Sequence, residues 1–129
     1  MSYPPHSSPL PKQDDLTLPP VVGKLHAGPF LWLAPPGHYE YNHVDPDDGM
    51  LMIMSGSKRV RLYSPDQIHK VYPNPLGSKG RTLQSQVDCD APDLEQFPEF
   101  ASATVQECIV GAGDALFIPA FTWHQVQQP

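Results

Sequence analysis

From Pro29 onward, short apolar runs alternate with turn residues, and this texture leaves few folds open to the chain. The runs are "FLWL" before a Pro-Pro-Gly turn, alternating "HYEYNHVD", "MLMIM", "KRVRLY" after "SGS", "TVQECIV", "ALFIP" after Gly-Ala-Gly-Asp, and "TWHQV". Runs of about four to eight residues bounded by Gly, Pro, Asn and Ser are typical of strands. The pattern predicts an all-β domain whose strands pair in antiparallel sheets.

Two segments carry brief helix signals. In "SPDQIHKVY", Ser64 is a candidate N-cap, Pro65 takes the first helical position, and Gln67 completes a capping box. In "DAPDLEQFPEF", Asp93 is a second candidate cap, but Pro98 soon ends any helix there. We therefore expect the helices to be short insertions.

Residues 1–28 have a different composition from the rest of the chain. They hold six of the 17 prolines beside Ser, Lys and Asp, with little periodicity that would bury a face. We interpret this stretch as a Pro-rich mobile or extended arm that docks locally through "LTLPPVV". The domain itself then spans residues 29–129.

Length and charge narrow the class of protein. A chain of 129 residues suffices for one hydrophobic core, and a net charge of −6 argues against a face that binds DNA. No apolar run approaches the roughly 20 residues that cross a bilayer, and the N-terminus lacks a signal-peptide pattern. Two cysteines without tight spacing fit a cytoplasmic or nuclear protein.

A histidine and an aspartate, His43 and Asp45, stand two residues apart in an alternating strand and so point to one face. They can chelate a metal ion, and His124 in "FTWHQV" is the best candidate for a third ligand. Two histidines and one carboxylate leave three coordination positions open, as in non-haem Fe(II) sites that bind a cosubstrate and dioxygen. The alternative is an ordinary hydrogen-bonded pair near a surface turn.

Lys58 shares a strand face with Val60 and Leu62, the residues expected in the core. An unpaired ammonium group there would cost several kcal/mol, so Lys58 calls for an anion. A dicarboxylate with one end on the metal would supply it. The alternative is that Lys58, near the strand end, reaches into solvent. His6, His26, His38 and His69 have no partner at ligand spacing, and Asp47 and Asp48 fit a solvated turn with Gly49.

The chain resembles the JmjC-type, cupin-fold oxygenases that depend on Fe(II) and 2-oxoglutarate, above all the factor-inhibiting-HIF-like protein hydroxylases and the wybutosine-pathway tRNA hydroxylase. The resemblance covers about residues 30–127. It is carried by "NHVD", "GSKRVRLYSPDQ", "YPNP", "QSQVDCDAPDLEQFPEF" and "GAGDALFIPAFTWHQV". It implies a double-stranded β-helix, or jelly roll, that uses Fe(II), 2-oxoglutarate and dioxygen.

The resemblance also implies roles for individual residues. His43, Asp45 and His124 would be the iron ligands, Lys58 would bind the C5 carboxylate of 2-oxoglutarate, and Gln84 would hold the substrate. The expected activity is that of a dioxygenase that hydroxylates a protein side chain. The alternatives are an inactive truncated cupin module that binds a protein, and a lysine demethylase.

Several positions depart from the family pattern. Glu40 stands where relatives carry Thr or Ser and would repel a dicarboxylate if it faced the pocket. Simple alternation of side chains turns Glu40 away from the pocket, so a β-bulge in this strand would decide which way it points. Gly49 replaces an Asn and Leu83 an Arg. The chain also ends at Pro129, which predicts the loss of the closing C-terminal strand and an open sheet edge for a homo-dimer.

Overall fold

The computed structural model describes residues 20, 22–23, 25, 28–75 and 83–129. By their internal contacts, Met1–Leu33 and Ala34–Pro129 form two compact units. The predicted "FLWL" strand is wrong: in the described part of the first unit no strand forms, and Phe30 and Trp32 are each 72% exposed. A strand needs a hydrogen-bonded neighbour, and the sequence pattern does not show whether one exists. The predicted arm lies largely outside the described residues.

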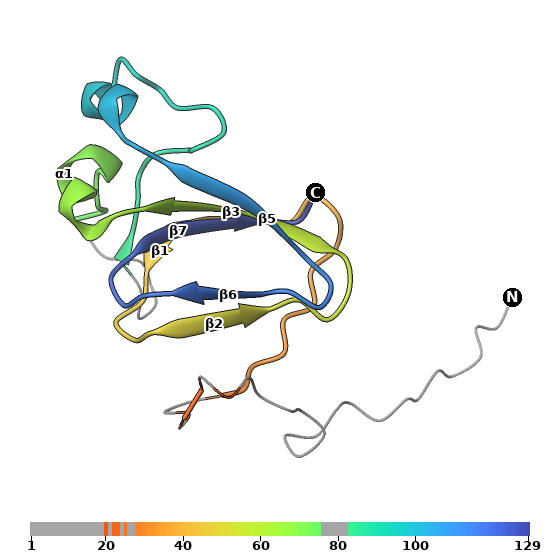
Figure 1. The fold of residues 1–129 in the computed structure, drawn as a ribbon. Coiled ribbons are helices and arrows are strands. Elements are labelled where there is room, and N and C mark those ends of the chain that lie inside the picture. Colours follow the sequence, from red (N-terminus) through yellow and green to blue (C-terminus); the bar gives the residue numbers. More distant parts are fainter. Residues whose placement is uncertain (1–19, 21, 24, 26–27, 76–82) are drawn as a thin grey trace, which may run out of the picture. The chain divides into compact units, whose positions relative to one another are not determined.

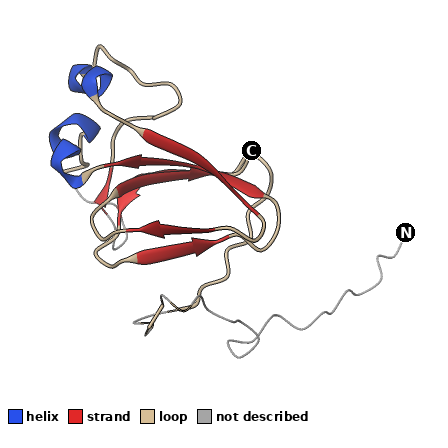
Figure 2. Ribbon diagram, viewed as in Figure 1, coloured by secondary structure: helices blue, strands red, loops and turns tan. Residues whose placement is uncertain are grey.

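Two antiparallel sheets make up the second unit (Figures 1 and 2). The five-stranded sheet has the spatial order β4 (Leu83–Gln84), β1 (Tyr39–Val44), β7 (Trp123–Gln127), β3 (Ser57–Tyr63) and β5 (Gln106–Gly111). The two-stranded sheet pairs β2 (Gly49–Met52) with β6 (Ala115–Ile118). This architecture confirms the predicted all-β class.

Each face of the larger sheet covers a separate apolar core. Val60, fully buried on β3, packs with Ile53 and Val110 on the face toward β2 and β6. We call this the inner face. On the opposite, outer face, Tyr63 and Trp123 pack with Val71 of the helical insertion. The alternation of β3 therefore has apolar residues on both faces, because both are covered.

The helical insertions are short, as predicted, but their caps differ from the prediction. The 3₁₀ helix η2 (Pro65–Gln67) leads into α1 (Ile68–Val71), and the Ser64 hydroxyl caps no backbone N–H. Instead, the buried Gln67 side chain donates to the Thr104 carbonyl oxygen at 2.9 Å and accepts from the Thr104 N–H at 2.6 Å. The sequence could not reveal this because the partner is 37 residues away.

At the second predicted cap, Asp93, the chain forms a turn and not the start of a helix. Asp93 Oδ1 accepts the N–H groups of Glu95 and Gln96 at 3.1 Å each. The 3₁₀ helix η3 (Pro98–Ser102) begins only afterwards, at the proline. Among the described residues, no helix is long and apolar enough to cross a membrane.

The register of β1 against β7 contains an irregularity. His43 lies opposite His124, and Glu40 lies opposite Val126, so β1 advances three residues where β7 advances two. This is a β-bulge, which reverses the alternation on one side of it. The last strand, β7, is paired on both sides, while β4 and β5 are the edges of the larger sheet. Dimerisation through an open edge stays a prediction.

Candidate metal centre

The structure brings His43, Asp45 and His124 together on the inner face. Their ligand atoms all lie within 4.8 Å of one another. Asp45 Oδ2 is 3.9 Å from His43 Nε2 and 3.6 Å from His124 Nε2, and the two imidazole centroids are 4.2 Å apart. Strand pairing between β1 and β7 therefore unites residues that are about 80 positions apart in the chain.

Backbone carbonyl groups select the tautomer of both imidazole rings. His43 Nδ1 lies 2.8 Å from the Tyr41 carbonyl oxygen, and His124 Nδ1 lies 2.9 Å from the Thr122 carbonyl oxygen. A carbonyl only accepts, so each Nδ1 carries a hydrogen, and in the neutral tautomer Nε2 is the nitrogen with the lone pair that can bind a metal. Burial lowers the pKa of His124, and the neighbouring His43 lowers it further, which favours the neutral form that binds a metal.

Two hydrogen bonds join the loop that carries Asp45 to the loop that leads into His124. The Phe121 N–H donates to the Asp45 carbonyl oxygen, and the Ala120 N–H donates to Asp48 Oδ1, each at 2.8 Å. Asp48 is thus more than the solvated turn residue that the sequence suggests. Its partner is 72 residues away, and no local signal could have identified it.

The geometry fits a metal ion that keeps open coordination positions. Two ligands that are each about 2.1 Å from one ion and at right angles lie about 3 Å apart, so a small inward movement would suffice here. The His124 side chain is 7% exposed and His43 is 16% exposed, whereas Asp45 is 45% exposed. The centre is therefore anchored on the buried side and open on the side of the carboxylate.

Gln84 and Lys58 lie on the same face as the two histidines. Gln84 is directly opposite His43 across the β4–β1 pair, and opposed residues point to the same side of a sheet. Lys58 is two residues from the buried Val60, whose partner on β7 is Val126. Among the described residues, Lys58 has neither a hydrogen-bond nor an ion-pair partner.

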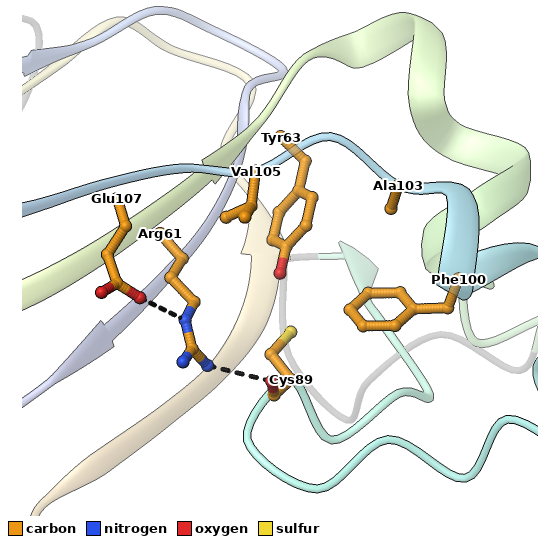
Figure 3. Close-up of a pocket in the computed structure, with 7 residues that line it drawn as sticks. All are labelled: Arg61, Tyr63, Cys89, Phe100, Ala103, Val105 and Glu107. Carbon is orange, nitrogen blue, oxygen red and sulfur yellow. Dashed lines mark hydrogen bonds and ion pairs between the residues drawn. The ribbon is translucent and has the colours of Figure 1, made fainter.

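A hollow lies on the outer face of the larger sheet, and Figure 3 shows the side chains that line it. It measures about 220 Å³ and is lined by side chains that include Tyr63, Cys89 and Phe100. Its charged groups pair with one another: Arg61 donates to Glu107 at 2.7 Å and to the Cys89 carbonyl oxygen at 3.0 Å. These bonds hold the loop at Cys89 against β3, which is a structural role.

The hollow leads to a prediction about thiol reactivity. Burial raises the pKa of the Cys89 thiol, and Cys89 is only 9% exposed, so little thiolate is accessible. A Cys108→Ser variant, which retains Cys89, should react with Ellman's reagent at least about tenfold more slowly than Cys89→Ser, which retains the partly exposed Cys108. The two rates should converge in guanidinium chloride. Equal rates in the folded proteins would contradict the burial of Cys89.

Two antiparallel sheets, with two histidines of the larger sheet and the carboxylate of Asp45 brought together, define a β-sandwich protein with a candidate mononuclear metal site. The family model described as the cupin-like domain matches residues 3–129. The chain therefore belongs to the cupin-like JmjC domain family, which confirms the predicted jelly-roll class.

Curated relatives with related sequences are known from animals and an amoeba. Lysine-specific demethylase 8 of Danio rerio is 38% identical over 96 residues, which cover 74% of this chain and 23% of that protein. tRNA wybutosine-synthesizing protein 5 of Homo sapiens is 38% identical over 94 residues, 73% of this chain and 28% of that protein. JmjC domain-containing protein D of Dictyostelium discoideum is 38% identical over 96 residues, covering 74% and 21%. The chain thus spans about a quarter of these relatives.

Proposed function

We propose that this domain is an Fe(II)- and 2-oxoglutarate-dependent dioxygenase. The observation that carries the proposal is the convergence of His43, Asp45 and His124, with each Nδ1 bonded to a backbone carbonyl oxygen and each Nε2 left available as a ligand. This donor set suits Fe(II) with open positions, whereas a structural zinc site has a closed shell of four protein ligands. When bound, the iron would supply the redox chemistry that couples decarboxylation of 2-oxoglutarate by dioxygen to hydroxylation of a C–H bond.

Lys58 is the proposed anchor for the far carboxylate of 2-oxoglutarate. Leu62 is opposite His124, and Lys58 lies four residues earlier on β3, which corresponds to about 13 Å along the strand. The Lys58 side chain and an extended five-carbon dicarboxylate together span such a distance. The apolar Val60 and Val126 line the face between them and limit access of water.

Gln84 is the proposed contact to the substrate. Its position beside His43 lets its amide both donate and accept hydrogen bonds next to the open side of the metal centre. We infer a protein side chain as the substrate class and hydroxylation as the outcome. The names of two relatives suggest alternative substrate classes. One relative is named a lysine-specific demethylase, and the other is named a tRNA wybutosine-synthesizing protein.

A non-catalytic cupin module that binds a protein is the second candidate function. Glu40 and Gly49, at positions where resembling oxygenases carry a hydroxyl and an amide, favour it. A Cβ atom at Gly49 would lie 3.9 Å from the Ile118 carbonyl oxygen, an ordinary contact, so the backbone does not require glycine there. The absent amide is therefore a chemical rather than a steric difference.

Succinate formation tests the proposed function. The purified chain is loaded anaerobically with Fe(II) and 2-oxoglutarate, oxygen is admitted, and succinate is measured against a His43→Ala control. Succinate above the control supports the oxygenase. Metal binding without any succinate, in the presence or absence of candidate peptides, would favour the binding module instead.

Removing the Lys58 ammonium group should weaken the binding of 2-oxoglutarate and leave the binding of the metal ion unchanged. We expect Lys58→Ala to raise the dissociation constant for 2-oxoglutarate by about tenfold to a hundredfold, because a charge-assisted pair is lost. Affinity for Mn(II), an analogue of Fe(II) that resists oxidation, should change less than about twofold. Lys70→Ala is the matched control, since Lys70 lies in α1 and contacts the Ser102 carbonyl oxygen. An unchanged affinity for 2-oxoglutarate would remove Lys58 from the site.

A further inference from the structure

Glu40 lies on the inner face because of the bulge in β1. With regular alternation, residues 40 and 43 would point to opposite faces. The register instead pairs Glu40 with Val126 and His43 with His124, and both partners lie on one face of β7. Val126 packs into the inner core, so the Glu40 side chain points the same way.

Along the strand direction, Glu40 on β1 lies in the row between the candidate ligands and Lys58, which is on β3, beyond β7. The first row contains His43 and His124, and the next contains Glu40, Val126 and Val60. Lys58 follows on β3, two residues beyond Val60. A ligand that reaches from the metal centre to Lys58 therefore passes the Glu40 carboxylate.

Glu40 has one charged neighbour among the described residues, and its carboxylate acts on the candidate metal centre. Its side chain is 30% exposed, and its only ion-pair contact within the described residues is with His38, whose Nε2 lies 3.7 Å from Oε1. The Glu40 charge also acts on the His124 imidazole, where it raises the pKa and so opposes the lowering of that pKa by burial. The field of this carboxylate thus extends to the candidate metal centre.

We propose that Glu40 is a specificity-determining residue that weakens the preference for a dicarboxylate cosubstrate by opposing the attraction of Lys58. The proposal rests on the proposed oxygenase function. Its physical basis is Coulombic: a second carboxylate that approaches Lys58 on β3 comes under the repulsion of a negative charge on β1, on the other side of β7. A 2-oxo acid without a distal carboxylate escapes this repulsion. Glu40 therefore reduces the preference for 2-oxoglutarate over an uncharged analogue of the same length.

The test compares two ligands on Mn(II)-loaded protein, without oxygen. Calorimetric titration gives dissociation constants for 2-oxoglutarate and for 2-oxopentanoate, which has the same five carbons but no second carboxylate. The variants are Glu40→Gln, which keeps size and removes charge, and Glu95→Gln, which removes an exposed charge from the turn before η3. Mn(II) affinity and thermal melts are measured for each.

For Glu40→Gln we expect 2-oxoglutarate to bind about threefold to tenfold more tightly, with 2-oxopentanoate and Mn(II) changed less than about twofold. The gain should shrink at high salt because the repulsion is screened. Glu95→Gln should leave all three affinities unchanged.

Two other results would each overturn a different claim. If 2-oxoglutarate binds the wild type but binds Glu40→Gln equally tightly, or both ligands gain alike, the specificity proposal fails and the proposed function stands. If Mn(II) binds but 2-oxoglutarate binds neither protein, the proposed cosubstrate is wrong, and the specificity proposal falls with it.

Discussion

Replacing Asp45 by alanine is expected to weaken binding of Fe(II) or Mn(II) by at least about a hundredfold and to abolish succinate formation. Asp45 is the single carboxylate of the candidate site, and its Oδ2 lies 3.6–3.9 Å from both Nε2 atoms. Two neutral imidazoles alone would supply neither the charge nor the third ligand of the face. Metal affinity is measured by anaerobic titration, followed by the succinate assay.

Asp47→Ala is the matched control for the loss of Asp45. Asp47 is an exposed carboxylate two residues further along the same turn, so its removal changes the net charge equally. We expect metal affinity within about twofold of wild type for this control, because exposed charges are screened. A fully active Asp45→Ala variant, or equal losses in the two variants, would contradict the assignment of Asp45 as a ligand.

Truncation of Trp123 should produce the largest loss of stability, about 3–5 kcal/mol in the free energy of unfolding. Trp123 is 1% exposed, lies opposite Tyr63 across the β7–β3 pair, and fills the core under the helical insertions. Trp123→Ala leaves a cavity that the surrounding strands cannot fill. Urea unfolding followed by far-UV circular dichroism gives the change without depending on tryptophan fluorescence.

Trp32→Ala makes the same substitution at a residue that is 72% exposed. It should change the free energy of unfolding by less than about 0.5 kcal/mol. Because His124 follows Trp123 directly, metal affinity of Trp123→Ala is measured at a temperature where the variant is folded. Similar losses of stability in the two tryptophan variants would contradict the buried placement of Trp123.

Local patterns in the sequence predicted most of the strands correctly. The alternation of "HYEYNHVD" matches β1, "KRVRLY" falls within β3, and "TWHQV" overlaps β7. The prediction that His43 and Asp45 share one strand is wrong in part, because β1 ends at Val44 and Asp45 lies in the loop that follows. Local patterns failed for "FLWL", because an apolar run forms a strand only where another strand is available to pair with it.

Hydrogen bonds between distant segments were beyond the reach of such patterns. Gln67 bonds Thr104, and Asp48 bonds Ala120, so side chains that look like a local cap and a solvated turn are tied to remote backbone. Many residue types can make such bonds. Which partner is bonded depends on which chain segments meet after folding, and the type of a single residue does not reveal that partner.

The amino-acid order alone established an all-β chain and the strand that carries His43, since the period of two is a property of the extended backbone. Pairing across the sheet decided the rest. It set His124 opposite His43, and it placed the bulge that turns Glu40 inward. The register between β1 and β7 is set by the pairing of two strands that are about 80 residues apart in the chain. A shift of one residue would turn every side chain of the shifted strand to the opposite face of the sheet.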